Sequence, residues 1–434
     1  MGPPTSLLLA VAKIAQIITA SPTPRHISHL SAERQTQISE ASPAAVKFLS
    51  HGAGYGVDIT FGRETFTLIF DTGSSDMWLP TKECVCVGPD MRRVPVTMCG
   101  IGQTCDSGFS GGKIPDVNFN ITYGHGEFVV GSMGYESVTV GGVTVPKQEA
   151  ALVNYGFWMG DKATSGLMGW SFPTLTSAYP GTDPSKDNRK ITGVRNYNPF
   201  IFNAIEQAGV NPMFGYAFSK RSESQDNQVG GQLSIGGVPN VAHGAWTSTP
   251  IKIMALSPKA PPEASQKYTF YTVIPDGFAI AKPPNDSKRD TDAADSADSD
   301  AANSAAMPAY PNSEPMIVDS GTTVSYLPRD IAMKYASMTK PAARWNQQGH
   351  LYQVPCNAWV PNLSVRIGGQ DLWYNREDLL LTGELGQDPY DKSYCNLGVQ
   401  PAPGPPFVLG GTFLRAVVTV HDLGQHKIWF AQRQ

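Results

Sequence analysis

Alternation of apolar and polar residues is the clearest pattern along the chain, and it predicts strands. Apolar residues occupy every second position over 57–61 and again over 66–70, and a turn at 62–64 separates the two runs. Such alternation is typical of a hairpin with one buried face. Four valines flank Gly141-Gly142 within residues 138–145, and this arrangement predicts a second hairpin.

The chain also repeats itself at two places in matching register. Residues 69–80 (IFDTGSSDMWLP) resemble residues 317–328 (IVDSGTTVSYLP), and residues 167–172 (LMGWSF) resemble residues 408–413 (VLGGTF). The glycine of the second element follows the aspartate of the first by 98 residues in one copy and by 91 in the other. The repeat therefore predicts a divergent duplication with two similar halves.

Composition favours an all-β protein built from these halves. The 43 glycines and 35 prolines among 434 residues are too many for a mainly helical protein, although a short helix is expected over 199–208. We predict an N-terminal β-lobe over 51–237 and a C-terminal β-lobe over 238–434. A pseudo-symmetric pair of lobes leaves a cleft between them.

Charge excludes one class of function and the hydropathy pattern another. Thirty-three basic and 37 acidic residues give a net charge of −4, which does not fit a protein that binds nucleic acid through bulk charge. No apolar run reaches 18 residues, so no transmembrane helix is expected. We therefore expect neither a nucleic-acid partner nor a membrane-bound form.

Three segments lie outside the predicted lobe cores. Residues 1–20 have an apolar stretch that ends at Ala20 and resemble a secretory signal; an amphipathic helix is the alternative. Residues 21–50 are polar and predict a short prosegment or a flexible segment. Residues 282–315 are acidic and poor in large apolar side chains, so we predict a disordered surface insertion.

Six cysteines fall into two clusters and favour disulfides. The first cluster has the spacing C-x-C-x12-C-x5-C, and the second is a single pair; the six are Cys84, Cys86, Cys99, Cys105, Cys356 and Cys395. A zinc site is the rival interpretation, but the usual C-x2-C spacing is absent and no histidine lies near. We predict disulfides and no metal. The pairing within the first cluster stays open.

Asp71 and Asp319 occupy equivalent positions in the two halves, and they are the candidate chemical groups. Each follows an apolar strand and precedes a hydroxyl residue and a glycine, so the two can meet at the lobe junction. Two carboxylates that close share one proton. The ionised one can activate a water, and the protonated one can polarise a carbonyl and protonate a leaving amine. The pair predicts peptide hydrolysis without a metal or other cofactor.

These motifs resemble those of the pepsin-like aspartic proteases, most closely the fungal members, from about Tyr55 to Phe430. The two family motifs match the tetrapeptides Asp71-Thr72-Gly73-Ser74 and Asp319-Ser320-Gly321-Thr322. The resemblance implies that Asp71 and Asp319 are catalytic. It also implies that Thr72 and Ser320 hydrogen-bond across the lobe junction, and that Ser74 and Thr322 hydrogen-bond the outer carboxylate oxygens.

The family's flap, a hairpin that covers the cleft, is matched by residues 121–126 (ITYGHG). The resemblance implies that Tyr123 is the flap tyrosine, with Gly124 and Gly126 at a tip that can bend. It implies that Trp78 hydrogen-bonds this tyrosine. His125 is either a solvated tip residue or, when charged, a group that favours acidic substrate side chains.

Other positions match the family or depart from it. Cys356 and Cys395 resemble its second-lobe disulfide. Ser165 and Gly411 stand where many members have aspartate. Neither position is one of the two motif aspartates, so we expect activity to be retained.

The resemblance implies an aspartic endopeptidase that acts at acidic pH on protein and peptide substrates, with apolar residues around the cut. Statine-type inhibitors are expected to bind. We expect a monomer, because both half-sites lie on one chain, and a secreted or, alternatively, vacuolar location. A non-catalytic binding or inhibitor protein of the same fold is the alternative function.

Overall fold

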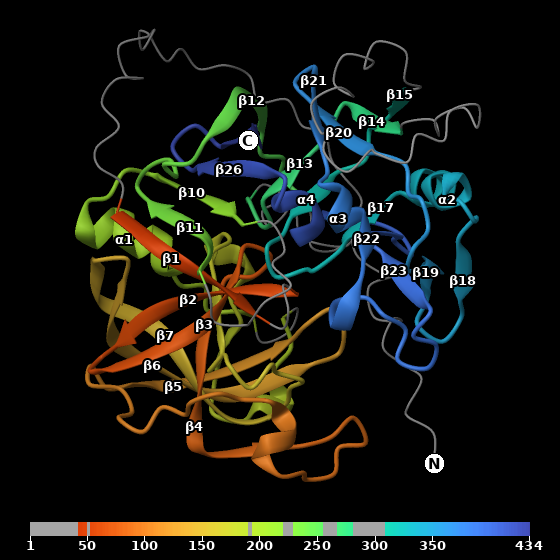
Figure 1. The fold of residues 1–434 in the computed structure, drawn as a ribbon. Coiled ribbons are helices and arrows are strands. Elements are labelled where there is room, and N and C mark those ends of the chain that lie inside the picture. Colours follow the sequence, from red (N-terminus) through yellow and green to blue (C-terminus); the bar gives the residue numbers. More distant parts are fainter. Residues whose placement is uncertain (1–41, 50–52, 190–192, 220–228, 255–266, 281–308) are drawn as a thin grey trace, which may run out of the picture.

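The computed structural model describes residues 42–49, 53–189, 193–219, 229–254, 267–280 and 309–434. The predicted signal at 1–20 lies outside these ranges. Strands dominate, and the first half of the chain forms one body while the second half forms another beside it (Figure 1). The predicted all-β, two-lobed architecture is confirmed.

A 14-stranded sheet runs through the first half and into the second. In spatial order its strands are β12 (His243–Pro250), β27 (Lys427–Arg433), β26 (Val417–Asp422), β10 (Met213–Phe218), β11 (Val229–Ile235), β1 (Ser42–Leu49), β2 (Gly54–Phe61), β3 (Glu64–Asp71), β8 (Leu167–Gly169), β4 (Met77–Cys86), β7 (Val143–Phe157), β6 (Phe128–Val140), β5 (Lys113–Thr122) and β9 (Ala178–Pro180).

Three smaller sheets build the rest of the second half. The first contains β13 (Thr272–Val273), β16 (Met316–Val318), β25 (Phe407–Leu409), β17 (Ser325–Leu327) and β24 (Val399–Pro401). The second contains β15 (Ala309–Pro311), β14 (Gly277–Ile280), β20 (Leu363–Ile367) and β21 (Gln370–Trp373). The third contains β18 (Arg344–Asn346), β19 (Leu351–Pro355), β23 (Tyr394–Leu397) and β22 (Leu380–Leu381).

Among the residues that the structure describes, helices are few and short. They are α1 (Phe200–Ala208), α2 (Arg329–Met338), α3 (Arg376–Leu379) and α4 (Gly411–Leu414). The predicted helix at 199–208 is α1, which ends at Gly209 in the left-handed conformation that glycine adopts readily. Within the described residues, no helix has the length and apolarity needed to cross a membrane.

The two sequence repeats form the same substructure in each half. Strand β3 pairs in parallel with β8, and β4 pairs antiparallel with β8. Strand β16 likewise pairs in parallel with β25, and β17 pairs antiparallel with β25. Ile69 faces Leu167 and Ile317 faces Val408, so the two copies share one register.

The shared sheet corrects one prediction about the N-terminal segment. Residues 21–50 were expected to be irregular, but 42–49 form β1, which lies between β11 and β2. Three alternate side chains of β1 are buried, those of Ala44, Val46 and Phe48. This alternation is short and lies in a polar stretch, and pairing on both edges of the strand stabilises it.

The end of the predicted disordered insertion, by contrast, is ordered. Residues 282–308 lie outside the described ranges, whereas 309–311 form β15 and pair with β14. The ring of Tyr310 packs against the apolar core, and the Asn312 backbone N–H donates to the Asp276 carbonyl at 3.2 Å. Strand pairing and this aromatic contact order the end of the segment.

One ion pair is completely buried in the second half and contacts the first. The Arg415 Nε, just after α4, donates to the Asp378 Oδ1 of α3 at 2.6 Å, and both side chains are 0% exposed. Arg415 also donates to the Tyr55 hydroxyl of β2 at 3.4 Å. Gly411, where many family members carry aspartate, lies beside this guanidinium. Asp378 supplies the negative charge that neutralises the Arg415 guanidinium.

Asp378→Ala should lower the free energy of unfolding by about 3–5 kcal/mol, because it leaves the buried Arg415 charge uncompensated. Denaturant unfolding at neutral pH measures this change. Asp371→Ala is the matched control, since its pair with Arg366 has a similar N–O distance of 2.7 Å but is partly exposed. That control should cost about 1 kcal/mol or less. Equal losses of unfolding free energy in the two variants would show that burial does not make the Asp378–Arg415 pair more costly to break.

Candidate active site

Asp71 and Asp319 lie at the junction of the two halves, at equivalent ends of their strands. Asp71 ends β3 and pairs with Gly169, while Asp319 follows β16, and its N–H donates to the Leu409 carbonyl at 3.1 Å. Both line one cavity of about 630 Å³. In each half, the parallel pairing sets the aspartate beside the end of the strand formed by the second repeat.

The Asp71 carboxylate is held by its own loop. Its Oδ1 accepts from the Gly73 N–H at 2.7 Å, and its Oδ2 accepts from the Ser74 hydroxyl at 2.5 Å. The side chain is 6% exposed. The hydrogen bond from Ser74 that the resemblance implied is present.

The Asp319 carboxylate is held in the same way. Its Oδ1 accepts from the Gly321 N–H at 2.8 Å, and its Oδ2 accepts from the Thr322 hydroxyl at 2.6 Å. Each tetrapeptide thus binds its own carboxylate through the same two positions. The two loops are related by a local pseudo-twofold arrangement.

Reciprocal hydrogen bonds tie these two loops together. The Thr72 N–H donates to the Ser320 hydroxyl at 3.0 Å, and the Ser320 N–H donates to the Thr72 hydroxyl at 3.0 Å. Thr72 also donates to the Val318 carbonyl, and Ser320 donates to the Phe70 carbonyl. Both side chains are buried, so four bonds fix the loops without competition from water.

The close approach of the carboxylates depends on glycine. A Cβ on Gly73 would lie 2.5 Å from the Asp319 Cγ, and a Cβ on Gly321 would lie 2.5 Å from the Asp71 Oδ1. Burial raises the pKa of Asp71 well above its usual range, and the charge of Asp319 raises it further. The bonds from Ser74 and Gly73 only partly offset these effects. The aspartate pair, Asp71 with Asp319, therefore retains a proton in acid.

The flap hairpin is formed by β5 and β6, with residues 123–127 at its tip. The Trp78 Nε1 donates to the Tyr123 hydroxyl at 2.7 Å, as the resemblance implied. Gly126 adopts a φ of 97°, which favours glycine, and its N–H donates to the Tyr123 carbonyl. Tyr123 and Gly124 line the same cavity as the aspartate pair.

His125 does not stand alone at this tip. Its Nε2 pairs with the Oε2 of Glu127, whose carboxylate is buried while the histidine is half exposed. The hypothesis that His125 offers a free positive charge to acidic substrates is therefore weakened. Glu127 belongs to no periodic pattern or motif that the sequence analysis identified.

Two of the six predicted disulfide cysteines are unpaired thiols. The bridges are Cys86–Cys99 and Cys356–Cys395, whereas Cys84 and Cys105 are buried and free. Cys84 belongs to the apolar cluster around Trp78, but Cys105 belongs to the main core. The prediction of disulfides at these two positions is wrong.

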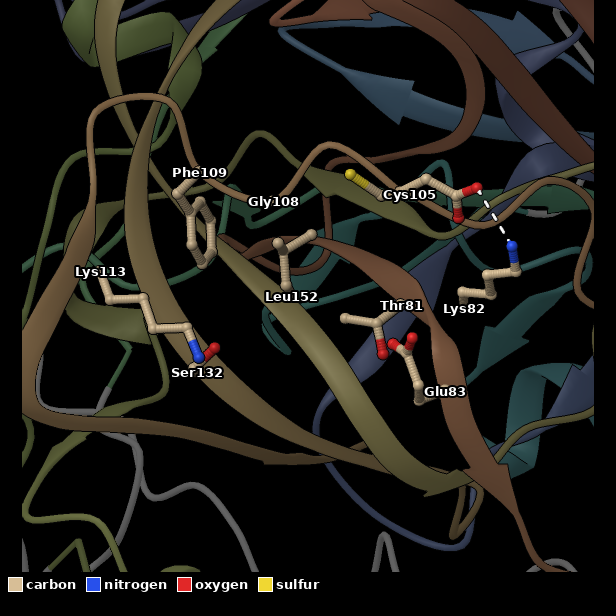
Figure 2. Close-up of a pocket in the computed structure, with 10 residues that line it drawn as sticks. Thr81, Lys82, Glu83, Cys105, Gly108, Phe109, Lys113, Ser132 and Leu152 are labelled. Carbon is tan, nitrogen blue, oxygen red and sulfur yellow. Dashed lines mark ion pairs between the residues drawn. The ribbon is translucent and has the colours of Figure 1, made fainter.

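Cys105 borders a second, smaller cavity of about 380 Å³ in the first half (Figure 2). Leu152 and Phe109 form its apolar side, and Lys82 lies 3.9 Å from Asp106 at the other side. Burial raises the pKa of the Cys105 thiol, and that of Cys84 to about 11. Both thiols are therefore poor nucleophiles.

A buried histidine lies among aromatic residues of the shared sheet. His421 of β26 is 0% exposed and stacks on Phe214, with ring centroids 4.5 Å apart. Its Nε2 lies 3.3 Å from the Tyr216 hydroxyl, and within the described residues its Nδ1 has no hydrogen-bond partner. Burial lowers the pKa of His421 to about 3. The sequence offered no signal for this group.

Two carboxylates from two similar β-lobes, joined by reciprocal loop hydrogen bonds under a hairpin flap, define the pepsin-like class of aspartic proteases. A family model of eukaryotic aspartyl proteases matches residues 54–256 and 295–433. The chain belongs to this family and is an aspartic-type endopeptidase.

Individual relatives agree with this assignment. A probable aspartic-type endopeptidase of Aspergillus fumigatus is 32% identical over 92% of this chain and 83% of its own length. Mucorpepsin of Rhizomucor pusillus is 27% identical over 87% and 78%. The crystal structure of an aspartic proteinase from Irpex lacteus shares the fold, with a TM-score of 0.63 and 18% identity over 90% of this chain and 97% of that one.

Gly321→Ala should lower kcat/KM on a peptide substrate at least a hundredfold, because the new Cβ displaces the Asp71 carboxylate. Gly244→Ala is the control, since its Cβ would have no heavy atom closer than 3.7 Å. Steady-state kinetics and thermal unfolding of both variants measure the effect. A Gly321→Ala protein with more than a tenth of wild-type activity would contradict the close approach.

His421→Phe should remove part of the loss of stability in acid. As the pH falls from 6.5 towards 3, His421 takes up a proton in the unfolded chain but not in the folded protein. The unfolded state then binds more protons, so stability falls by about 1.4 kcal/mol per pH unit over this window. Urea unfolding at pH 7 and pH 4.5 should show a loss roughly 2–3 kcal/mol smaller in the variant. The exposed His350→Phe is the control, and equal losses in all three proteins would overturn the assignment.

Proposed function

We propose that the protein hydrolyses peptide bonds in acid through Asp71 and Asp319. The observation that carries the proposal is the meeting of two equivalent, loop-held carboxylates in one cleft. Burial and mutual repulsion raise the pKa of Asp71, which favours a pair that carries one proton and one negative charge.

In the proposed reaction, a water lies between the two carboxyl groups. The ionised carboxylate accepts a proton from this water as it attacks the substrate carbonyl carbon, and the protonated carboxyl donates to the carbonyl oxygen. The tetrahedral intermediate then collapses as a proton passes to the leaving nitrogen. The hydrogen bonds from Gly73, Ser74, Gly321 and Thr322 support this role, because they fix the carboxylate oxygens in advance.

The cleft supports a preference for apolar substrate residues around the cut. Apolar side chains from both halves line it beside the aspartate pair, namely Ile69, Leu167, Phe270, Tyr326 and Val408. An extended peptide would lie between these walls. The flap would close over it, exclude water and strengthen the electrostatic interactions inside.

Several further expectations are part of the proposal. One chain supplies both carboxylates, which supports a monomeric enzyme, and statine-type inhibitors would occupy the place of the tetrahedral intermediate. The signal-like residues 1–20 support secretion, with a vacuolar location as the alternative. A non-catalytic binding protein would be expected to lack one aspartate or Tyr123, and all three are present.

The test is proteolysis of a denatured globular substrate from pH 2 to 7 by wild-type protein, with and without a statine-type inhibitor. We expect cleavage that is strongest in acid and is blocked by the inhibitor. Asp71→Asn should lower the rate at least a thousandfold and keep the fold, because the pair then lacks one of its two carboxyl groups.

Two outcomes would contradict the proposal. Asp71→Asn with near wild-type activity would remove Asp71 from the reaction. Absence of cleavage by a processed and folded wild-type protein that still binds the inhibitor would favour the binding-protein alternative.

A further inference from the structure

Glu127 stands out because it is buried directly after three exposed residues of the flap tip. Residues 124–126 of the flap tip are exposed, whereas the Glu127 side chain is only 7% exposed. Burial of a carboxylate is costly unless it is paired and hydrogen-bonded. The groups that pair with the Glu127 carboxylate therefore fix the position of the flap tip.

The Glu127 carboxylate joins the flap to the segment that follows β7. Its Oε1 accepts from the Met159 N–H, and its Oε2 pairs with the Nε2 of His125. Met159 belongs to residues 158–164, which we call the wall loop because Trp158, Met159 and Asp161 line the cleft. Glu127 thus bonds the flap to the cleft wall.

Aromatic contacts also join the flap to the wall loop. The Tyr123 ring lies 5.6 Å from the Trp158 ring, and Trp158 lies 4.9 Å from Trp78, measured between centroids. Tyr123 is therefore held by Trp78 through its hydroxyl and by Trp158 through its ring. Glu127 fastens the neighbouring backbone to the same wall loop.

The wall loop is in turn held by residues 86–105, which we call the cysteine loop. The Gly160 N–H donates to the Cys99 carbonyl at 2.8 Å, and the Lys162 N–H donates to the Gly100 carbonyl at 2.7 Å. The Cys86–Cys99 bridge closes the cysteine loop. A continuous set of contacts runs from this bridge through the wall loop to the flap.

We propose that Glu127 is a positioning residue that fastens the flap tip to the wall loop and so keeps Tyr123 in place for substrate binding. This inference rests on the proposed proteolytic function. The cysteine loop acts as its support, because it fixes the backbone that carries the Met159 N–H. Without the bond from Met159 to Glu127, the flap occupies other positions as well. The apparent substrate affinity then falls in proportion to the fraction of molecules whose flap is positioned for binding.

The test compares Glu127→Ala with Glu127→Gln in steady-state peptide hydrolysis. Glu127→Ala should raise KM roughly tenfold, the factor that corresponds to about 1.4 kcal/mol, with kcat within about threefold of wild type. Glu127→Gln should recover most of the loss, because its amide oxygen still accepts from the Met159 N–H. The aspartate pair is untouched in both variants.

Glu136→Ala is the matched control, because Glu136 is a buried carboxylate of β6, the strand that begins directly after Glu127. It binds the Ser110 backbone and hydroxyl and the Ser137 N–H, and it does not line the cleft. We expect it to lower thermal stability and leave KM near the wild-type value. The same rise in KM in Glu136→Ala and Glu127→Ala would overturn the proposal, since general weakening of the hairpin would explain both.

A double-mutant cycle tests the role of the cysteine loop. Cys86→Ser with Cys99→Ser should raise KM, and adding Glu127→Ala should raise it little further, because both changes act through one bond. If the two changes raised KM by independent factors that simply multiply, Glu127 and the cysteine loop would not act through the same bond, and the proposal would be contradicted. An active wild type with unchanged KM in Glu127→Ala would overturn this inference alone, whereas an inactive wild type would overturn the proposed function.

Discussion

The structure depends on the reciprocal hydrogen bonds that join Thr72 and Ser320 at the junction of the two halves. These bonds are buried, and each loop supplies both a donor and an acceptor to the other. They place Gly73 against Asp319 and Gly321 against Asp71, so that no side chain separates the two carboxylates. The raised pKa of Asp71 follows from this geometry, since burial and the second charge both disfavour its ionised form.

Further contacts connect the two halves and hold the flap. The shared sheet, in which β26 pairs with β10, links the halves, and Arg415 connects Asp378 of the second half to Tyr55 of the first. The flap contacts the wall loop through Glu127 and Tyr123. The aspartate pair and the flap are therefore both held by contacts between segments that lie far apart in the sequence.

Much of this could be predicted from the sequence, because the repeat is local and in register. The motifs at Asp71 and Asp319 and the hairpins depend on short segments with strong patterns. The Trp78–Tyr123 bond joins residues 45 apart, and only the resemblance to the pepsin-like family implied it. Long-range partners could not be predicted in this way. Strand β1, the Asp378–Arg415 pair, the bond from Met159 to Glu127 and the separate burial of Cys84 and Cys105 depend on which surfaces meet after folding. A short polar stretch or a single charged residue carries no pattern that identifies its partner.

If two carboxylates from two similar halves meet and share a proton, their titration must show it. A carboxyl-carbon NMR titration of aspartate-labelled protein, with Asp71 assigned through Asp71→Asn, measures this. Asp71 should stay protonated at pH values where exposed aspartates have ionised. Its titration midpoint should fall when Asp319→Asn removes the second charge. A midpoint for Asp71 in the ordinary aspartate range, unaffected by Asp319→Asn, would show that the two carboxyl groups do not share a proton.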